Sequence, residues 1–155
     1  MGALSKYRMI NDKKKLFELA ELILFAVIVF VINIIYVGKF NTFYVLNDEF
    51  GYWASAAKFA GYDWSSAAST VNYYSYGYSL LLFPLFAVFK DPAMLYKAAL
   101  VMNAAMMSGC VFLAKGTAKN IAKDVSGFRL NIISLAVCLF PACIVHTRQI
   151  GRAHV

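Results

Sequence analysis

Charged residues are scarce in this sequence. Asp, Glu, Lys and Arg together make up 15% of the 155 residues, whereas 61% of the chain is apolar. A typical soluble domain is about 25% charged and about 45–50% apolar. A chain of this composition cannot cover itself with a water-compatible surface, so soluble, disordered and disulfide-scaffold classes are excluded. We expect an integral membrane protein.

Cysteine is also scarce, and the usual catalytic motifs are missing. The three cysteines, Cys110, Cys138 and Cys143, fall inside apolar segments. Their odd number and their spacing fit neither a disulfide framework nor a metal site, so we expect small buried apolar side chains. The sequence contains no glycine-rich phosphate loop, no Ser-His-Asp arrangement and no internal repeat. These absences leave a single segment, residues 39–72, as the candidate for chemistry.

The net charge of +7 is distributed at the edges of apolar runs. Five basic residues precede the first run, namely Lys6, Arg8, Lys13, Lys14 and Lys15. Most of the others lie in short gaps between later runs. This is the distribution of positively charged membrane flanks and not of a groove that follows a nucleic-acid backbone. We therefore expect no nucleic-acid partner.

Four apolar segments have the length of membrane spans, which need about 20 mainly apolar residues. We expect spans at 16–38, 73–89, 94–114 and 130–147, the last three within the region 73–148, with Pro84 bending the second span. A signal peptide is the competing interpretation of the first span, but that run is long and no small-residue cleavage site follows it. The predicted fold is an all-α, polytopic membrane helical bundle of about four transmembrane helices.

The basic flanks also indicate sidedness. Residues 1–15 carry the five basic side chains and are expected in the cytoplasm, so residues 39–72 form an outer loop in a multi-pass cell-membrane protein. A strictly alternating path then places residues 115–129 outside as well. That segment is itself basic, which conflicts with the positive-inside rule, so its sidedness stays open at this point.

A short amphipathic helix is expected in the outer loop. Apolar residues recur there at three- and four-residue steps after Asp48, beginning with Phe50 and Trp53. Asn47 or Asp48 is a suitable N-cap and Gly61 a suitable C-cap. We expect Phe50 and Trp53 to face lipid or the helical bundle.

Two acids, Asp48 and Glu49, begin this predicted helix. Acidic side chains commonly occur at helix N-termini because the free N–H groups stabilise negative charge, and this structural role needs no further function. The functional alternative is a carboxylate held at the water–lipid boundary, acting as a general base or as a ligand of a divalent metal ion. Spacing alone does not choose between these roles.

Aromatic residues crowd the same loop and the start of the next span. An interfacial aromatic belt accounts for them, and a sugar-binding platform is the functional alternative, because aromatic faces pack against apolar sugar faces. The two roles are compatible. The residues concerned are Tyr44, Tyr52, Trp53, Tyr62, Trp64, Tyr73, Tyr74 and Tyr76.

Three stretches together resemble a known family: the acid pair in NDEFGYW, the Tyr-rich YYSYGYSLLLFPLF, and KDPAMLYKAALVMNAAMMSG. They resemble the N-terminal part of GT-C type membrane glycosyltransferases, the class of protein O-mannosyltransferases and the aminoarabinose transferase of lipid A. The resemblance covers about residues 10–148, and its specific part is the acid pair with the Tyr-rich segment.

The resemblance implies transfer of a sugar from a polyprenyl-phosphate carrier to an extracytoplasmic acceptor, with inversion. It implies that Asp48 is the general base or a metal-binding carboxylate and that Glu49 positions acceptor or metal. Candidate substrate-binding residues are Tyr52, Tyr73, Tyr74, Tyr76 and Lys58. The one cofactor that the resemblance suggests is a divalent metal ion at Asp48.

Two observations complicate this interpretation. Members of the family have more spans and bind the carrier phosphate through later parts of the chain, so we expect these 155 residues to be inactive alone. Residues 150–155, IGRAHV, read as the translation of a common sequencing adapter, so we expect the natural chain to depart from this text near Gln149. The alternatives are a fragment of a polytopic transporter or flippase, or a noncatalytic membrane subunit.

Overall fold

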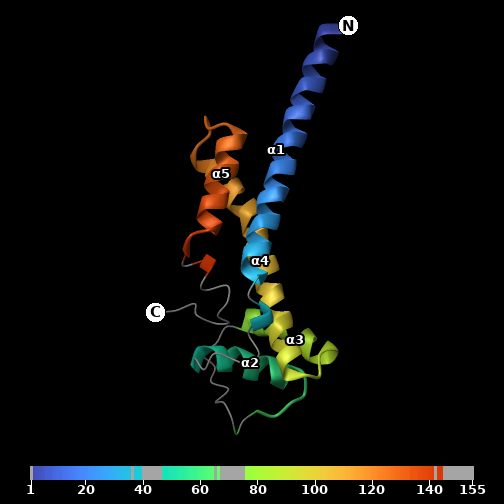
Figure 1. The fold of residues 1–155 in the computed structure, drawn as a ribbon, viewed down its shortest axis with the longest axis vertical. Coiled ribbons are helices and arrows are strands. Elements are labelled where there is room, and N and C mark those ends of the chain that lie inside the picture. Colours follow the sequence, from blue (N-terminus) through green and yellow to red (C-terminus); the bar gives the residue numbers. More distant parts are fainter. Residues whose placement is uncertain are drawn as a thin grey trace. The chain divides into compact units, whose positions relative to one another are not determined.

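The computed structural model describes residues 2–35, 37–39, 47–64, 66, 76–141 and 143–144. All regular structure within them is helical, with no strand, which confirms the all-α prediction (Figure 1). The helices are α1 (Gly2–Ile34), the 3-10 helix η1 (Val37–Lys39), α2 (Asn47–Phe59), α3 (Tyr76–Val88), α4 (Pro92–Ile121) and α5 (Gly127–Cys138).

Two helices, α1 and α4, are long and apolar enough to cross a membrane. The qualifying part of α1 is Asn11–Ile34, with a mean hydropathy of 2.4, and that of α4 is Pro92–Ile121, with a mean hydropathy of 1.5. Both exceed the about 20 residues that a crossing requires. These lengths and compositions are compatible with a membrane location, although an N-terminal apolar helix such as α1 also fits a signal sequence.

The other two predicted spans correspond to short apolar helices. α3 has 13 residues and α5 has 12, both below the length of a straight crossing. The regular part of α5 ends at Cys138, three residues before Pro141, whose ring opposes helix continuation over the preceding turn. α3 continues through Pro84 as far as Val88.

The junction between α3 and α4 is set by Asp91 and Pro92. The Asp91 carboxylate accepts a hydrogen bond from the Met94 N–H at 2.9 Å, and its carbonyl accepts one from the Leu95 N–H at 2.9 Å. Asp91 therefore caps α4, and Pro92 occupies the first helical position, where its missing N–H costs nothing. The new helix thus begins two residues before the span predicted from hydropathy.

The described chain divides into two compact units. The first unit combines Met1–Ile32 with Ala105–Cys143, and therefore contains α1, the second half of α4 and α5. Its core is formed by Leu22, Ala26 and Val29, spaced on one face of α1, with Val111 of α4 and Cys138 of α5. The three cysteines of the chain are free thiols, and Cys138 has the predicted role of a buried small side chain.

Hydrogen bonds fix α5 against α1 inside this first unit. The fully buried Asn131 of α5 donates from Nδ2 to the Glu18 carbonyl at 2.9 Å and to the Glu21 carboxylate at 2.7 Å. The Glu18 carboxylate also lies over the position that a Cβ on Gly127 would occupy. The start of α5 therefore lies beside residues 18–21 of α1.

The second unit consists mainly of Asn33–Ala104 and contains α2, α3 and the first half of α4. In this unit α2 and α3 pack against each other (Figure 1). The core takes residues from all three helices: Trp53, Ala56, Ala57, Leu82, Phe86, Leu95, Tyr96, Ala99 and Leu100. Small alanines on α2 permit this close approach of neighbouring helices.

Candidate functional site

The predicted acid-bearing helix is present as α2. Asn47 is its first residue, so Asp48 and Glu49 lie in its first turn, as the sequence predicted. The side chains of these two acids lie outside the described residues. Their backbone position is the N-terminus of a helix, where acidic residues are common.

The end of α2 is a glycine-based cap. Gly61 has a φ of +83°, its N–H donates to the Lys58 carbonyl at 3.1 Å, and the Tyr62 N–H donates to the Ala57 carbonyl at 2.9 Å. These two bonds and the left-handed glycine form a Schellman motif. The prediction of Gly61 as C-cap is thus confirmed, and the reversal of the chain at this residue directs Tyr62 and Trp64 toward α3.

Trp53 faces the helical bundle and not the lipid. Its side chain is fully buried, with its ring 5.8 Å from that of Phe86 and 6.3 Å from that of Tyr96. Phe50 is half-buried on the same helix. Trp53 therefore joins α2 to α3 and α4, and it is not available as a stacking surface for a sugar.

Tyr52 is also engaged in packing between α2 and α3. Its ring stands edge-on to that of Tyr78 at 5.6 Å, and its carbonyl accepts a hydrogen bond from the buried Ser79 hydroxyl at 3.0 Å. Tyr78 in turn donates to the Asn103 side chain at 2.7 Å. This network orients α2 on α3, and α2 carries the acid pair in its first turn.

Of the remaining predicted substrate-binding residues, the structure describes Tyr76 and Lys58. Tyr76 is exposed, and its ring lies 5.8 Å from that of Phe59 on α2. Lys58 is exposed in the last turn of α2. Tyr73 and Tyr74 lie outside the described residues.

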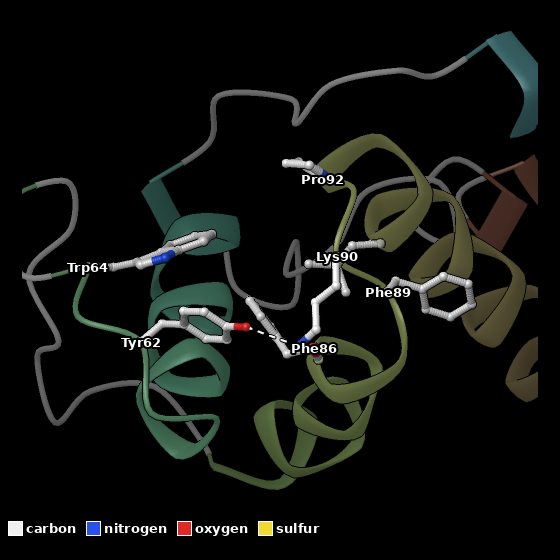
Figure 2. Close-up of a pocket in the computed structure, with 7 residues that line it drawn as sticks. Tyr62, Trp64, Phe86, Phe89, Lys90 and Pro92 are labelled. Atoms are coloured by element: carbon white, nitrogen blue, oxygen red, sulfur yellow. Dashed lines mark hydrogen bonds between the residues drawn. The ribbon is translucent and has the colours of Figure 1, made fainter.

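A pocket of about 300 Å³ lies where α2 ends and α3 gives way to α4 (Figure 2). The Tyr62 ring lies 5.8 Å from the Phe86 ring, and the Trp64 ring lies 6.0 Å from it. The wall is mostly apolar. The lining residues are Tyr62, Trp64, Phe86, Phe89, Lys90, Pro92 and Leu95.

Lys90 is the single cation of this lining. Its Nζ donates to the Tyr62 hydroxyl oxygen and to the Phe86 carbonyl, each at 3.3 Å, and Figure 2 shows its side chain extended toward Tyr62. The sequence interpretation counted Tyr62 and Trp64 among the aromatics and did not consider Lys90. The sequence feature that could have identified it is the position of Lys90, directly between an apolar run and the Asp91-Pro92 helix start.

Comparison with known proteins assigns the chain to no family. No protein-family model, curated protein or solved structure matches the chain. Among the described residues there is also no group of three or more His, Cys, Asp or Glu side chains that could hold a metal ion. A metal ion at Asp48 stays a prediction, because that side chain lies outside the described set.

Proposed function

We propose that this chain is the N-terminal part of an integral membrane glycosyltransferase that transfers a sugar from a polyprenyl-phosphate donor to an extracytoplasmic acceptor. The observation that carries the proposal is the position of the acid pair. Asp48 and Glu49 begin a helix that packs against α3 and that lies, in the sequence, between two helices long enough to cross a membrane. A carboxylate at such a boundary can meet both a lipid-linked donor and a water-borne acceptor.

The packing of the first unit supports a definite orientation. Residues 18–21 of α1 lie beside the start of α5, so the basic segment before α5 lies at the same end as the basic start of α1. The positive-inside rule places both segments in the cytoplasm. The sidedness of residues 115–129, which the sequence analysis left open, is cytoplasmic in this proposal.

This orientation needs two crossings between those segments, and α1 and α4 provide them. The 13-residue α3 then does not cross but lies with α2 at the outer membrane surface. The bundle therefore has α1 and α4 as crossings in its described part. A crossing that begins with α5 stays a prediction.

The proposed reaction needs a general base but no general acid. Glycoside hydrolases use two carboxyl groups, one of which protonates the leaving group. A polyprenyl phosphate leaves as a stable anion, so only the acceptor needs a base, and Asp48 takes that role. Glu49 positions the acceptor or a divalent metal ion.

The functional test is Asp48→Asn in the uninterrupted protein, assayed with lipid-phosphate-linked sugar. We expect turnover to fall by at least about a hundredfold, at the low end of general-base effects. Asp63→Asn, an exposed acid in the same outer segment, is the matched control and should transfer normally. Wild-type transfer by Asp48→Asn would overturn the assignment and favour a noncatalytic membrane subunit.

The orientation is tested separately with an impermeant thiol reagent. In a background whose native cysteines are replaced by alanine, the exposed Ser66 and Ser126 are each replaced by cysteine. We expect Ser66→Cys to label in intact cells and Ser126→Cys to label only after permeabilisation. Labelling of both positions from one side would refute the two-crossing path.

A further inference from the structure

The pocket between α3 and α4 combines an apolar wall with one charged group, which is the composition of a site for an amphiphile. Aromatic faces of Tyr62, Trp64 and Phe86 supply the wall, and Lys90 supplies the charge. A sugar alone would need several polar partners, whereas an uncharged hydrocarbon would form no interaction with the Lys90 ammonium. The chemistry therefore favours a ligand with both a hydrocarbon part and an anionic group.

The hydrogen bonds of Lys90 leave its charge and one donor available. Both of its acceptors, the Tyr62 hydroxyl oxygen and the Phe86 carbonyl, are uncharged. An ammonium has three N–H donors, so one remains. Because Tyr62 accepts from Lys90, its own O–H also remains free to donate. Two donors, one of them charged, thus lie together at the edge of an apolar wall.

This arrangement matches a phosphate group. Phosphate oxygens form strong charge-assisted hydrogen bonds with ammonium groups, and lysine binds them as a point charge. The neighbouring Asp91 carboxylate accepts from the Met94 N–H at the start of α4, so it is occupied in capping that helix. The negative charge of Asp91 therefore lies at the N-terminus of α4, where the free N–H groups of the helix stabilise it.

The surroundings of the pocket point to a lipid and not to a soluble phosphate. Val88 and Met94, on either side of the Lys90–Pro92 junction, are 70% and 56% exposed. Apolar side chains this exposed at the ends of apolar helices are expected to contact hydrocarbon. A volume of about 300 Å³ is at the small end of ligand sites, so it accommodates part of a lipid.

We propose that this pocket binds the phosphate and the adjoining chain segment of an anionic glycerophospholipid of the surrounding bilayer. The phosphate receives hydrogen bonds from Lys90 and Tyr62, and the hydrocarbon lies along Trp64 and Phe86. This binding requires neither Asp48 nor glycosyl transfer. Its failure and the failure of the proposed function are therefore distinguishable.

The test uses the fluorescence of Trp64. The chain has two tryptophans, so a Trp53→Phe background leaves Trp64 as the sole reporter. The protein is reconstituted in bilayers that contain brominated phosphatidylglycerol or brominated phosphatidylcholine, whose bromines quench tryptophan at short range. We expect phosphatidylglycerol to quench at about tenfold lower mole fraction than phosphatidylcholine, which corresponds to about 1.4 kcal/mol.

Lys90→Gln should remove this preference, whereas Lys119→Gln, the same charge change at an exposed position of α4, should keep it. Native mass spectrometry of the protein with both tryptophans provides a second measurement. It should show a retained phosphatidylglycerol that is lost in Lys90→Gln and kept in Lys119→Gln. Circular dichroism checks that each variant is folded.

Four outcomes would overturn the proposal. One is equal quenching by the two lipids, and another is a preference that survives Lys90→Gln. The third is displacement of the brominated lipid by inorganic phosphate, which would identify a site for a soluble anion. Preferential displacement by farnesyl phosphate would likewise exclude a glycerophospholipid as the ligand and identify a prenyl-phosphate site.

Discussion

Truncation of Trp53 is the most direct test of how the outer segment folds. Its side chain is fully buried and contacts rings on two other helices, Phe86 at 5.8 Å and Tyr96 at 6.3 Å. Replacing a buried tryptophan by alanine costs about 3–5 kcal/mol, because transfer free energy is lost and a cavity remains. Each ring pair accounts for about 0.5–1.5 kcal/mol of that loss.

The loss can be measured as a melting temperature by circular dichroism in detergent. For chains of about 150–250 residues, 1 kcal/mol shifts the midpoint by about 2–4 °C. We expect Trp53→Ala to melt roughly 6–20 °C below the wild-type protein. Trp53→Phe, which retains a ring, should lose less.

Phe59→Ala is the matched control on the same helix. Phe59 is 44% exposed and has one described ring contact, with Tyr76, so its removal should cost less than about 1.5 kcal/mol. If Trp53→Ala melts within about 2 °C of the wild-type protein, Trp53 is not a core residue. Its packing in the second unit would then be wrong, and a lipid-facing Trp53 would replace it.

Three further changes probe single contacts by the same melting assay. Asn131→Ala should cost about 1–2 kcal/mol through its bonds to α1, and a double-mutant cycle with Glu21→Ala should show coupling; additive losses would contradict the contact. Gly61→Ala should cost about 1–2 kcal/mol from the positive φ alone, because a Cβ added at Gly61 would meet no atom within 4 Å. Gly61→Asn should cost less. Equal stability of Gly61→Ala and the wild-type protein would exclude the left-handed cap. Ser79→Ala should cost about 1 kcal/mol by removing the hydrogen bond of its hydroxyl to the Tyr52 carbonyl; no loss would exclude this bond.

The sequence predicted the parts of the fold that depend on local chemistry. The end of α2 at Gly61 follows from capping preferences, which act within a few residues. At the other end, Asn47, one of the two predicted N-caps, is already the first residue of the helix. The first apolar run was recognised as a helix, but α1 extends from Gly2, well before the predicted residue 16. The residues before position 16 include four Lys and one Arg, which are good helix formers, so the helix extends beyond the apolar run.

Hydropathy does not encode where a regular helix ends within an apolar run. The runs predicted as spans at 73–89 and 130–147 overlap the regular helices α3 and α5, which have 13 and 12 residues. The pocket was missed because Tyr62 and Lys90 are far apart in sequence and meet only after the cap of α2 reverses the chain. The acid pair was identified from its residue type, but its geometry depends on side chains outside the described set.

The pocket is also local in the chain. Among the residues that the structure describes, its lining begins at Tyr62 and ends at Leu95, with none from α1, from the second half of α4 or from α5. During synthesis this stretch is complete before most of α4 has been made. Tyr62 and Lys90 are 28 residues apart, and closing a loop of this length loses less chain entropy than closing contacts that span the whole chain. The site can therefore assemble, and recruit its lipid, before the first unit has all of its helices.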